Sequence, residues 1–206
     1  MAFQTVWYST ELPKNIIEVI SDELGFNFDP EMIESTVYGN TLRKDLRNSK
    51  NAWIPSEHWI GGFIWHYIER ANRENFLYDI TNIDSESIQY TSYSVGQYYG
   101  WHTDSDLSIH YKPEEIKESE TINPIEYLNK TCESVRKISF VLQLSDPDDY
   151  EGGNLQLLAS NGKPYFAPRK RGTIILFDSR TQHRVLKVTK GIRKSLVGWV
   201  VGPRWR

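Results

Sequence analysis

The stretch 96-GQYYGWHTDSD-106 places a histidine and several carboxylate or hydroxyl side chains directly behind a run of aromatic residues. His102 and Asp104 are two positions apart, so on a β-strand both side chains leave the same face, while Thr103 points the other way. A histidine nitrogen and a carboxylate oxygen on one face can bind adjacent positions of a metal ion. A polar turn can contain the same pair by chance, so a metal site needs a third ligand from elsewhere in the chain.

His183 is the candidate third ligand, because it follows the strand-like TIILFD and begins another predicted strand. Two histidines and one carboxylate leave coordination positions open, which suits the chemistry of non-heme Fe(II) oxygenases. The other histidines, His58, His66 and His110, are expected at polar or core-edge positions. Asp106 lies at the start of a predicted loop and is not expected to be a ligand.

Arg193 follows His183 by ten residues and shares a predicted strand face with Ser195. A guanidinium binds both oxygens of a carboxylate, and a neighbouring hydroxyl adds one more hydrogen bond. The pair is therefore a candidate clamp for an acidic ligand, and the alternative for Arg193 is an ordinary surface arginine. Lys194 is expected to point the opposite way, into solvent.

The elements that must position these residues change in type along the chain. Apolar residues recur at helical spacing in 12–24 and in the segment that follows Ser56. After residue 85, runs of β-branched and aromatic residues alternate with turn signals. These runs predict strands at 87–94, 97–102, 136–144, 154–158, 173–178, 183–189 and 195–201. Helices followed by many short strands favour an antiparallel sandwich or barrel with helices packed on one side.

Length and composition limit the number of domains and the classes of partner and cross-link that the chain can have. The 206 residues suit one domain, the net charge of −3 gives no general footprint for polyanions, and a single cysteine, Cys132, excludes an intramolecular disulfide. The segment 105–133 is acidic and poorly periodic, which predicts a mobile loop or a small insert. No signal peptide or long apolar run is evident, so we expect a soluble, cytoplasmic protein that does not associate with membranes.

Taken together, these residues resemble the 2-oxoglutarate- and Fe(II)-dependent dioxygenases, specifically the prolyl 4-hydroxylase branch. The resemblance covers residues 86–202 and includes the Glu-Gly-Gly turn at 151–153. Its spacing is carried by Gln89, Tyr93, Gly96, Tyr99, His102, Asp104, His183 and Arg193. It implies a mainly β fold with N-terminal helices and a double-stranded β-helix core, the jelly-roll or cupin-like arrangement. One domain, 1–206, is expected, with supporting helices and strands in 1–85 and the jelly-roll core with loop 105–133 in 86–202.

The resemblance also implies roles for individual residues. His102, Asp104 and His183 would hold Fe(II), and Arg193 would pair with the distal carboxylate of 2-oxoglutarate. Further residues are expected to line the cosubstrate pocket or its mouth: Tyr93, Tyr99, Ser139, Ser195 and Trp199. Tyr98 is expected on the strand face opposite Tyr99, and Trp101 on the face opposite His102. Tyr98 is therefore expected to be a packing residue and Trp101 a core residue.

No catalytic residue beyond the metal centre is implied. The reaction would consume O₂ and decarboxylate 2-oxoglutarate to succinate and CO₂, with ascorbate as the expected reductant. Related halogenating enzymes have a small residue at the position of Asp104, so the carboxylate favours hydroxylation.

For the substrate, the resemblance favours a proline residue of a peptide or protein, hydroxylated at C4. The segment 105–133 could close over such a peptide. A free amino acid or another small metabolite is the alternative on the same barrel. A nucleic acid is less favoured, because only the basic C-terminal segment 169–206 argues for it. A binding module with an inactive site is disfavoured by the complete set of His102, Asp104, His183 and Arg193.

Overall fold

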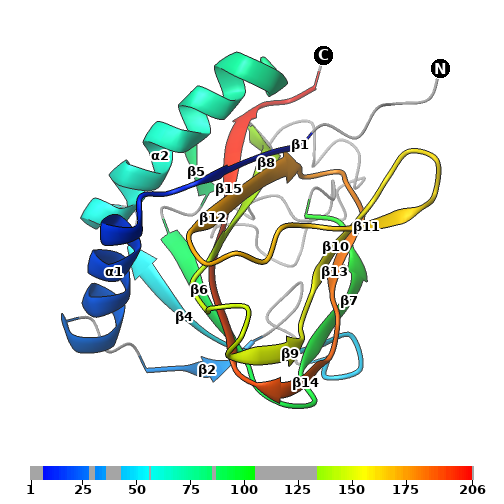
Figure 1. Ribbon diagram of the computed structural model, residues 1–206. Coiled ribbons are helices and arrows are strands. Elements are labelled where there is room, and N and C mark those ends of the chain that lie inside the picture. Colours follow the sequence, from blue (N-terminus) through cyan, green and yellow to red (C-terminus); the bar gives the residue numbers. More distant parts are fainter. Residues whose placement is uncertain are drawn as a thin grey trace, which may run out of the picture.

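The chain builds two facing antiparallel sheets with helices on one side (Figure 1). The computed structural model describes residues 7–27, 31–35, 43–55, 57–84, 87–104 and 134–205. The predicted acidic segment 105–133, with Asp106, His110 and Cys132, therefore lies outside the described residues, as does Ser56.

The large sheet has the strand order β1-β12-β8-β15-β6-β4-β2, and β5 pairs with β15 beside this path. All of its strand pairs are antiparallel. The strands are β1 (Trp7–Glu11), β2 (Ile33–Glu34), β4 (Lys50–Pro55), β5 (Asn82–Ile83), β6 (Ser87–Tyr93), β8 (Ser134–Gln143), β12 (Thr173–Asp178) and β15 (Arg193–Pro203).

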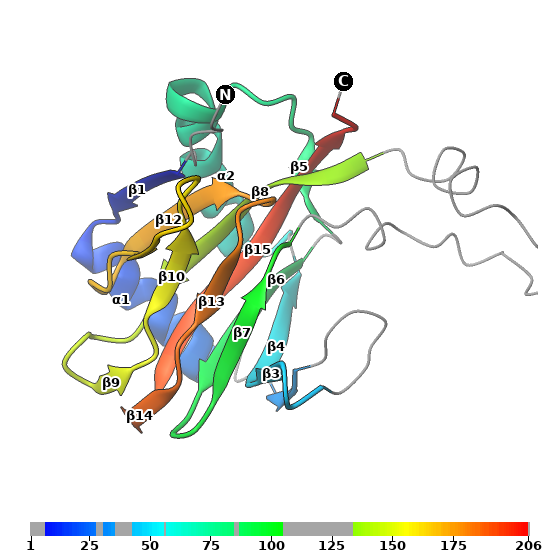
Figure 2. The same ribbon diagram turned by 90° about the vertical axis from the view of Figure 1, so that its right-hand side faces the viewer.

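The small sheet has the order β11-β10-β13-β7-β3, and β7 and β13 lie side by side in it (Figure 2). Its strands are β3 (Arg47–Asn48), β7 (Tyr98–His102), β10 (Leu155–Leu158), β11 (Pro164–Phe166) and β13 (His183–Val185). A separate pair consists of β9 (Tyr150–Gly152) and β14 (Val188–Gly191). The two facing antiparallel sheets form the jelly-roll arrangement, so the prediction of a mainly β fold with N-terminal helices is confirmed.

The helices cover the face of the large sheet that points away from the small sheet (Figure 1). They are α1 (Lys14–Asp22) and α2 (Trp59–Ala71), followed by the π-helical turns η1 (Glu23–Asn27) and η3 (Asn72–Phe76). Ile60, Ile64 and Ile68 recur every four residues on α2 and are fully buried, because this spacing keeps them on one helix face. Among the described helices, none combines the length and the apolar character that crossing a membrane requires.

The central strands of the large sheet are buried on both faces. All six residues of β12 are buried, which explains why its sequence TIILFD is almost continuously apolar and does not alternate. On β15, Leu196 and Val200 pack in the cluster beneath the helices, while Val197 packs in the cluster between the sheets. The odd-numbered positions of β15 therefore point into the barrel, and these include Arg193 and Ser195.

Seven strands lie outside the predicted runs, namely β1, β2, β3, β4, β5, β9 and β11, and one predicted strand is interrupted. β1 and β4 come from the N-terminal part of the chain and join the large sheet through β12 and β6, and β11 pairs only with β10. The predicted strand 183–189 divides into β13, which pairs in the small sheet, and β14, which pairs with β9. The division arises because the chain leaves the small sheet after Val185.

The expectation that Trp101 lies in the core is wrong. Its side chain is half-buried, and the guanidinium of Arg184 lies 4.5 Å from its ring centroid. Trp101 is on the strand face opposite His102, which is the outer face of the small sheet. That face carries Arg184 instead of a helix, so Trp101 packs at the surface. An irregularity in the pairing of β7 with β13 between Tyr99 and His102 lets Tyr98 share this face, where it packs as expected, with its hydroxyl donating to the Asp45 carbonyl at 3.0 Å.

Replacing Gly198 with alanine should destabilise the fold. Gly198 on β15 lies opposite Phe140 on β8, and a Cβ at position 198 would overlap the fully buried Phe140 ring. Overpacking of this kind costs about 1–3 kcal/mol. The free energy of unfolding from urea denaturation should fall by that amount. The control Gly62→Ala, at an exposed position of α2 with open space around it, should stabilise by roughly 0.5–1 kcal/mol. Equal effects at both positions would contradict this packing.

Candidate active site

The three predicted metal ligands lie together between β7 and β13. His102 is the last residue of β7, His183 is the first residue of β13, and the two residues are directly paired across the strands. Asp104 follows β7 and is buried. One ligand atom from each of the three residues lies within 4.8 Å of the others. The distances from Asp104 are 3.6 Å between Oδ1 and His102 Nε2, and 3.3 Å between Oδ2 and His183 Nε2.

Backbone carbonyls orient both imidazole rings. His102 Nδ1 lies 2.8 Å from the Gly100 carbonyl oxygen, and His183 Nδ1 lies 3.0 Å from that of Thr181. Because a carbonyl oxygen can only accept, each Nδ1 carries the proton and donates. This leaves the lone pair of each Nε2 directed at the shared site, which is how metal-binding histidines are held.

A pair of serines holds the Asp104 carboxylate. The Ser139 hydroxyl donates to Asp104 Oδ2 at 2.7 Å and lies 3.0 Å from the Ser179 hydroxyl. The Asp104 backbone N–H donates to the Ser179 carbonyl at 2.9 Å. Ser139 was expected to line the cosubstrate pocket, and the structure places its hydroxyl on the carboxylate of a metal ligand. Ser179 was not predicted, because it lies in a polar turn whose sequence resembles any surface turn.

The local electrostatics favour the protonation states that a metal needs at His102 and Asp104. Burial, together with the nearby His183, lowers the pKa of His102 to about 3, so this ring is neutral at pH 7. Burial opposes ionisation of Asp104, but His183 and His102 outweigh it and hold the pKa of Asp104 well below its ordinary value. A neutral imidazole and an ionised carboxylate are the forms that act as ligands. Burial opposes protonation of His183, but the Asp104 carboxylate outweighs it and raises the pKa of His183, so a metal would displace that proton.

Tyr99 stacks on His102 and links it to a residue that the sequence did not indicate. The two rings are parallel within 14°, with centroids 3.6 Å apart. The guanidinium of Arg47, on β3, lies 4.9 Å from the Tyr99 ring centroid and donates to Gln89 Oε1 at 2.6 Å. Arg47 is buried, and only the pairing of β3 with β7 brings it to Tyr99. Burial also raises the pKa of the Tyr99 hydroxyl, which therefore stays protonated.

Arg193 lies fully buried in the barrel interior beside Tyr93 and Ser195, and it shares a strand face with Ser195, as strand alternation predicted. Nη1 donates to Ser195 Oγ at 3.4 Å, and the guanidinium lies 5.6 Å from the Tyr93 ring centroid. Nη2 donates to Gln143 Oε1 at 2.9 Å, a contact that was not predicted. Within the described residues Nε has no partner and no carboxylate pairs with this guanidinium.

Burial lowers the pKa of Arg193, which shows the cost of keeping this charge away from water. A buried cation is costly without an anion beside it. Arg193 therefore marks a site that fits an anionic ligand group.

Trp199 is half-buried on the same interior face of β15. The guanidinium of Arg136 lies 4.0 Å from its ring centroid, and Trp53 of β4 lies 6.4 Å from it, ring to ring. Among the described residues, the buried Nε1 of Trp199 has no acceptor. Trp53 and Arg136 were not predicted, because their contacts with Trp199 join three different strands.

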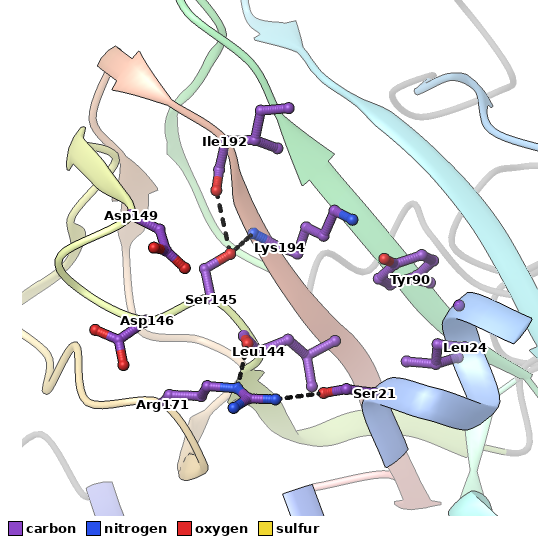
Figure 3. A pocket seen from close by; sticks show the side chains of 11 residues that line it. Ser21, Leu24, Tyr90, Leu144, Ser145, Asp146, Asp149, Arg171, Ile192 and Lys194 are labelled. Carbon is purple, nitrogen blue, oxygen red and sulfur yellow. Dashed lines mark hydrogen bonds between the residues drawn. The ribbon is translucent and has the colours of Figure 1, made fainter. Parts of the chain in front are cut away.

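A separate pocket of about 540 Å³ lies on the helix side of the large sheet (Figure 3). Two acids and two bases line it, Asp146 and Asp149 with Arg171 and Lys194, beside apolar residues such as Leu24. Arg171 donates to the Leu144 carbonyl and to the Ser21 hydroxyl. None of the lining residues is a histidine or a cysteine. Because Lys194 lines this pocket on the helix side, its side chain points away from the barrel interior. Arg193, the preceding residue, points into the interior, as strand alternation predicts.

Comparison with known proteins assigns this arrangement to a family. Residues 88–201 match the 2OG-Fe(II) oxygenase superfamily. A PKHD-type hydroxylase of Synechococcus sp. (strain JA-2-3B'a(2-13)) is 37% identical over 115 residues, which cover 55% of this chain and 42% of the relative. A PKHD-type hydroxylase of Picosynechococcus sp. (strain ATCC 27264 / PCC 7002 / PR-6) is 33% identical over 137 residues, which cover 65% of this chain and 51% of the relative. The chain thus spans about half the length of these curated relatives, or less.

Solved structures share the fold over nearly the whole chain. A prolyl-4-hydroxylase of Pseudomonas putida superposes with a TM-score of 0.65 at 17% identity, covering 97% of this chain and 93% of that one. A prolyl hydroxylase of Trichoplax adhaerens, in complex with a hypoxia inducible factor peptide fragment, superposes with a TM-score of 0.67 at 18% identity. This match covers 94% of this chain and 82% of that one. Two imidazoles whose Nε2 atoms face one carboxylate fit Fe(II). A buried arginine without a carboxylate partner among the described residues fits a dicarboxylate. The chain belongs to the 2OG-Fe(II) oxygenase superfamily, and the residues of its site fit the Fe(II) and 2-oxoglutarate for which that superfamily is named.

Proposed function

We propose that this protein hydroxylates a proline residue of a peptide at C4, in a reaction that depends on Fe(II) and 2-oxoglutarate. The observation that carries the proposal is the arrangement of the barrel interior. The group of His102, Asp104 and His183 lies in the same barrel as the buried Arg193, which lacks a carboxylate partner among the described residues. The peptide and the proline come from the relatives: PKHD-type and prolyl hydroxylases are among them, and one solved structure holds a peptide fragment.

The proposed roles follow the contacts. His102 and His183 would hold Fe(II) through Nε2, and Asp104 through a carboxylate oxygen that Ser139 keeps in place. Arg193 and Ser195 would bind the distal carboxylate of 2-oxoglutarate, with Tyr93 and Tyr99 as walls of its pocket. Trp199 would line the mouth.

Fe(II), with 2-oxoglutarate and O₂, supplies the oxidation, which yields succinate and CO₂, and ascorbate would keep the iron reduced. The protein has to position the groups, exclude water and neutralise charge. The charges of Fe(II), Asp104, Arg193 and a 2-oxoglutarate dianion cancel, so the loaded site can stay buried without a large desolvation cost. Because β1 and β4 pair with strands of the jelly-roll core, we propose that the chain acts as one domain.

A free amino acid or small metabolite is the second candidate substrate. Trp53 favours the peptide, because its exposed side chain extends the aromatic surface at Trp199 outward from the barrel. An extended chain can use such a surface, and a small molecule held inside the barrel would not reach it. A nucleic acid remains the least favoured candidate.

The substrate classes are separated by one assay. The protein is incubated with Fe(II), 2-oxoglutarate and ascorbate, together with a proline-rich peptide, free proline or single-stranded DNA. The expected result is succinate release stimulated by the peptide, with the mass of one oxygen atom gained on a proline residue. Succinate stimulated only by free proline would support the small-molecule substrate instead. If none of the added substrates gained an oxygen atom and no metal-dependent succinate were released, the proposed activity would be wrong.

Replacing His102 with alanine should abolish activity by removing a metal ligand. We expect the affinity for Mn(II), used as a stable substitute for Fe(II), to fall by roughly 100-fold or more. Equilibrium dialysis measures this affinity. The matched control is His66→Ala, at an exposed position of α2, which should bind Mn(II) like the unmodified protein. Equal affinity in both variants would show that the three residues are not the metal site.

Replacing Arg193 with alanine should raise the KM for 2-oxoglutarate and leave Mn(II) affinity unchanged. Truncating one member of a buried charge pair costs about 2–5 kcal/mol, so an increase of roughly 30-fold or more is expected. Lys194→Ala is the control on the neighbouring residue, whose side chain faces the outer pocket (Figure 3). Circular dichroism checks that both variants fold. A similar KM in both would contradict the role of Arg193.

A further inference from the structure

Gln143, at the end of β8, is the residue that holds the Arg193 guanidinium most closely. It is 2% exposed, and its Oε1 accepts from Arg193 Nη2 at 2.9 Å. Its Nε2 donates to the Pro168 carbonyl oxygen at 3.1 Å. These two contacts fix the orientation of the amide, because Arg193 can only donate and the Pro168 carbonyl can only accept. Among side chains of this size, only an amide serves both partners.

The groups around Arg193 leave its positive charge uncompensated. Its described partners are the Gln143 amide and the hydroxyls of Ser195 and Tyr150, all uncharged. Arg169 is a second cation in the same region, and its charge contributes to the lowered pKa of Arg193. Tyr150 lies between them in contact with both, since the Arg169 guanidinium is 4.4 Å from its ring centroid and its hydroxyl interacts with Arg193. Arg169 donates to the backbone carbonyls of Pro147 and Tyr150, so neither of these two guanidiniums is neutralised by a hydrogen-bonded carboxylate among the described residues.

We propose that Gln143 is a positioning residue that makes this anchor select a keto acid with an anionic distal end. The inference rests on the proposed binding of 2-oxoglutarate by Arg193. The neutral amide orients the guanidinium through Nη2 and does not neutralise its charge, so the positive charge and the unpartnered Nε–H remain for the distal carboxylate. A carboxylate at position 143 would pair with Arg193 itself, and it would face the Pro168 carbonyl without a hydrogen to donate.

The charge of residue 143 should therefore decide which cosubstrate binds. In Gln143→Glu, the new carboxylate would repel the distal carboxylate of 2-oxoglutarate across a buried site, where a like-charge contact costs several kcal/mol. A keto acid whose distal end is uncharged would lose much less. 2-Oxoglutaramate is the appropriate probe, because an amide replaces the distal carboxylate at nearly the same size.

Gln156 offers a matched control on another strand. It is 6% exposed on β10, and its Oε1 accepts from Arg184 Nε at 2.7 Å. Its neighbours Leu155 and Leu157 pack in the cluster between the sheets, so Gln156 points away from the barrel interior. Gln156→Glu thus makes the same chemical change in a similar glutamine–arginine pair that does not face the anchor.

The experiment measures binding of the two keto acids by isothermal titration calorimetry to the full chain loaded with Mn(II). The unmodified protein and Gln156→Glu should both prefer 2-oxoglutarate. Gln143→Glu should bind 2-oxoglutarate about 100-fold more weakly. Its affinities for Mn(II) and for 2-oxoglutaramate should stay close to those of the unmodified protein. This shift in selectivity is a readout that loss of packing alone would not produce.

The outcomes distinguish a failure of the proposed function from a failure of the proposed role of Gln143. If the Mn(II)-loaded unmodified protein does not bind 2-oxoglutarate, the proposed function fails. If it does and Gln143→Glu binds 2-oxoglutarate equally well, the role of Gln143 is wrong. Should Gln143→Glu not fold, Gln143→Met decides: it removes the acceptor without adding charge. We then expect about tenfold weaker 2-oxoglutarate binding with unchanged Mn(II) affinity, and unchanged 2-oxoglutarate binding would overturn the inference.

Discussion

The pairing of β13 with β7 is the constraint on which the site depends. It sets His183 directly opposite His102, with Asp104 two residues beyond. Side chains alternate along a strand, so a slip of one residue would turn one histidine to the outer face of the sheet. The register is in turn held by the packing of both sheets, since Val185 of β13 is buried in the cluster between them. The packing of the apolar core therefore fixes the strand register, and the strand register fixes the relative positions of the three metal-binding residues.

The polar interior of this barrel is stable because almost every buried polar group has a defined partner. Gly100 and Thr181 carbonyls hold the imidazoles, and Ser139 and Ser179 hold the carboxylate. Among the described residues, the exceptions include Arg193 Nε and Trp199 Nε1. Unpartnered buried polar atoms cost free energy in the empty protein, and ligand binding can recover it. Arg193 and Trp199 share the interior face of β15, which is consistent with a ligand path along that strand.

The N-terminal part of the chain does more than support the barrel. β3 brings Arg47 to the ring of Tyr99, which stacks on His102, and β4 brings Trp53 to Trp199. Both contacts join residues more than forty positions apart in the sequence. Differences in these segments are a physical route by which relatives on one fold can treat different substrates, because the metal ligands themselves come from other strands.

The sequence by itself determined the elements with local signals and the chemical identity of the site. The spacing of Ile60, Ile64 and Ile68 predicted α2, and the spacing of His102 and Asp104 predicted two ligands on one face. These inferences succeeded because each depends on the period of a single element. Tertiary structure alone decided the contacts of Arg47 with Tyr99, of Gln143 with Arg193 and of Ser139 with Asp104, and the exposure of Trp101. Strand pairing and register bring such distant residues together, and no local pattern of residue types encodes that pairing.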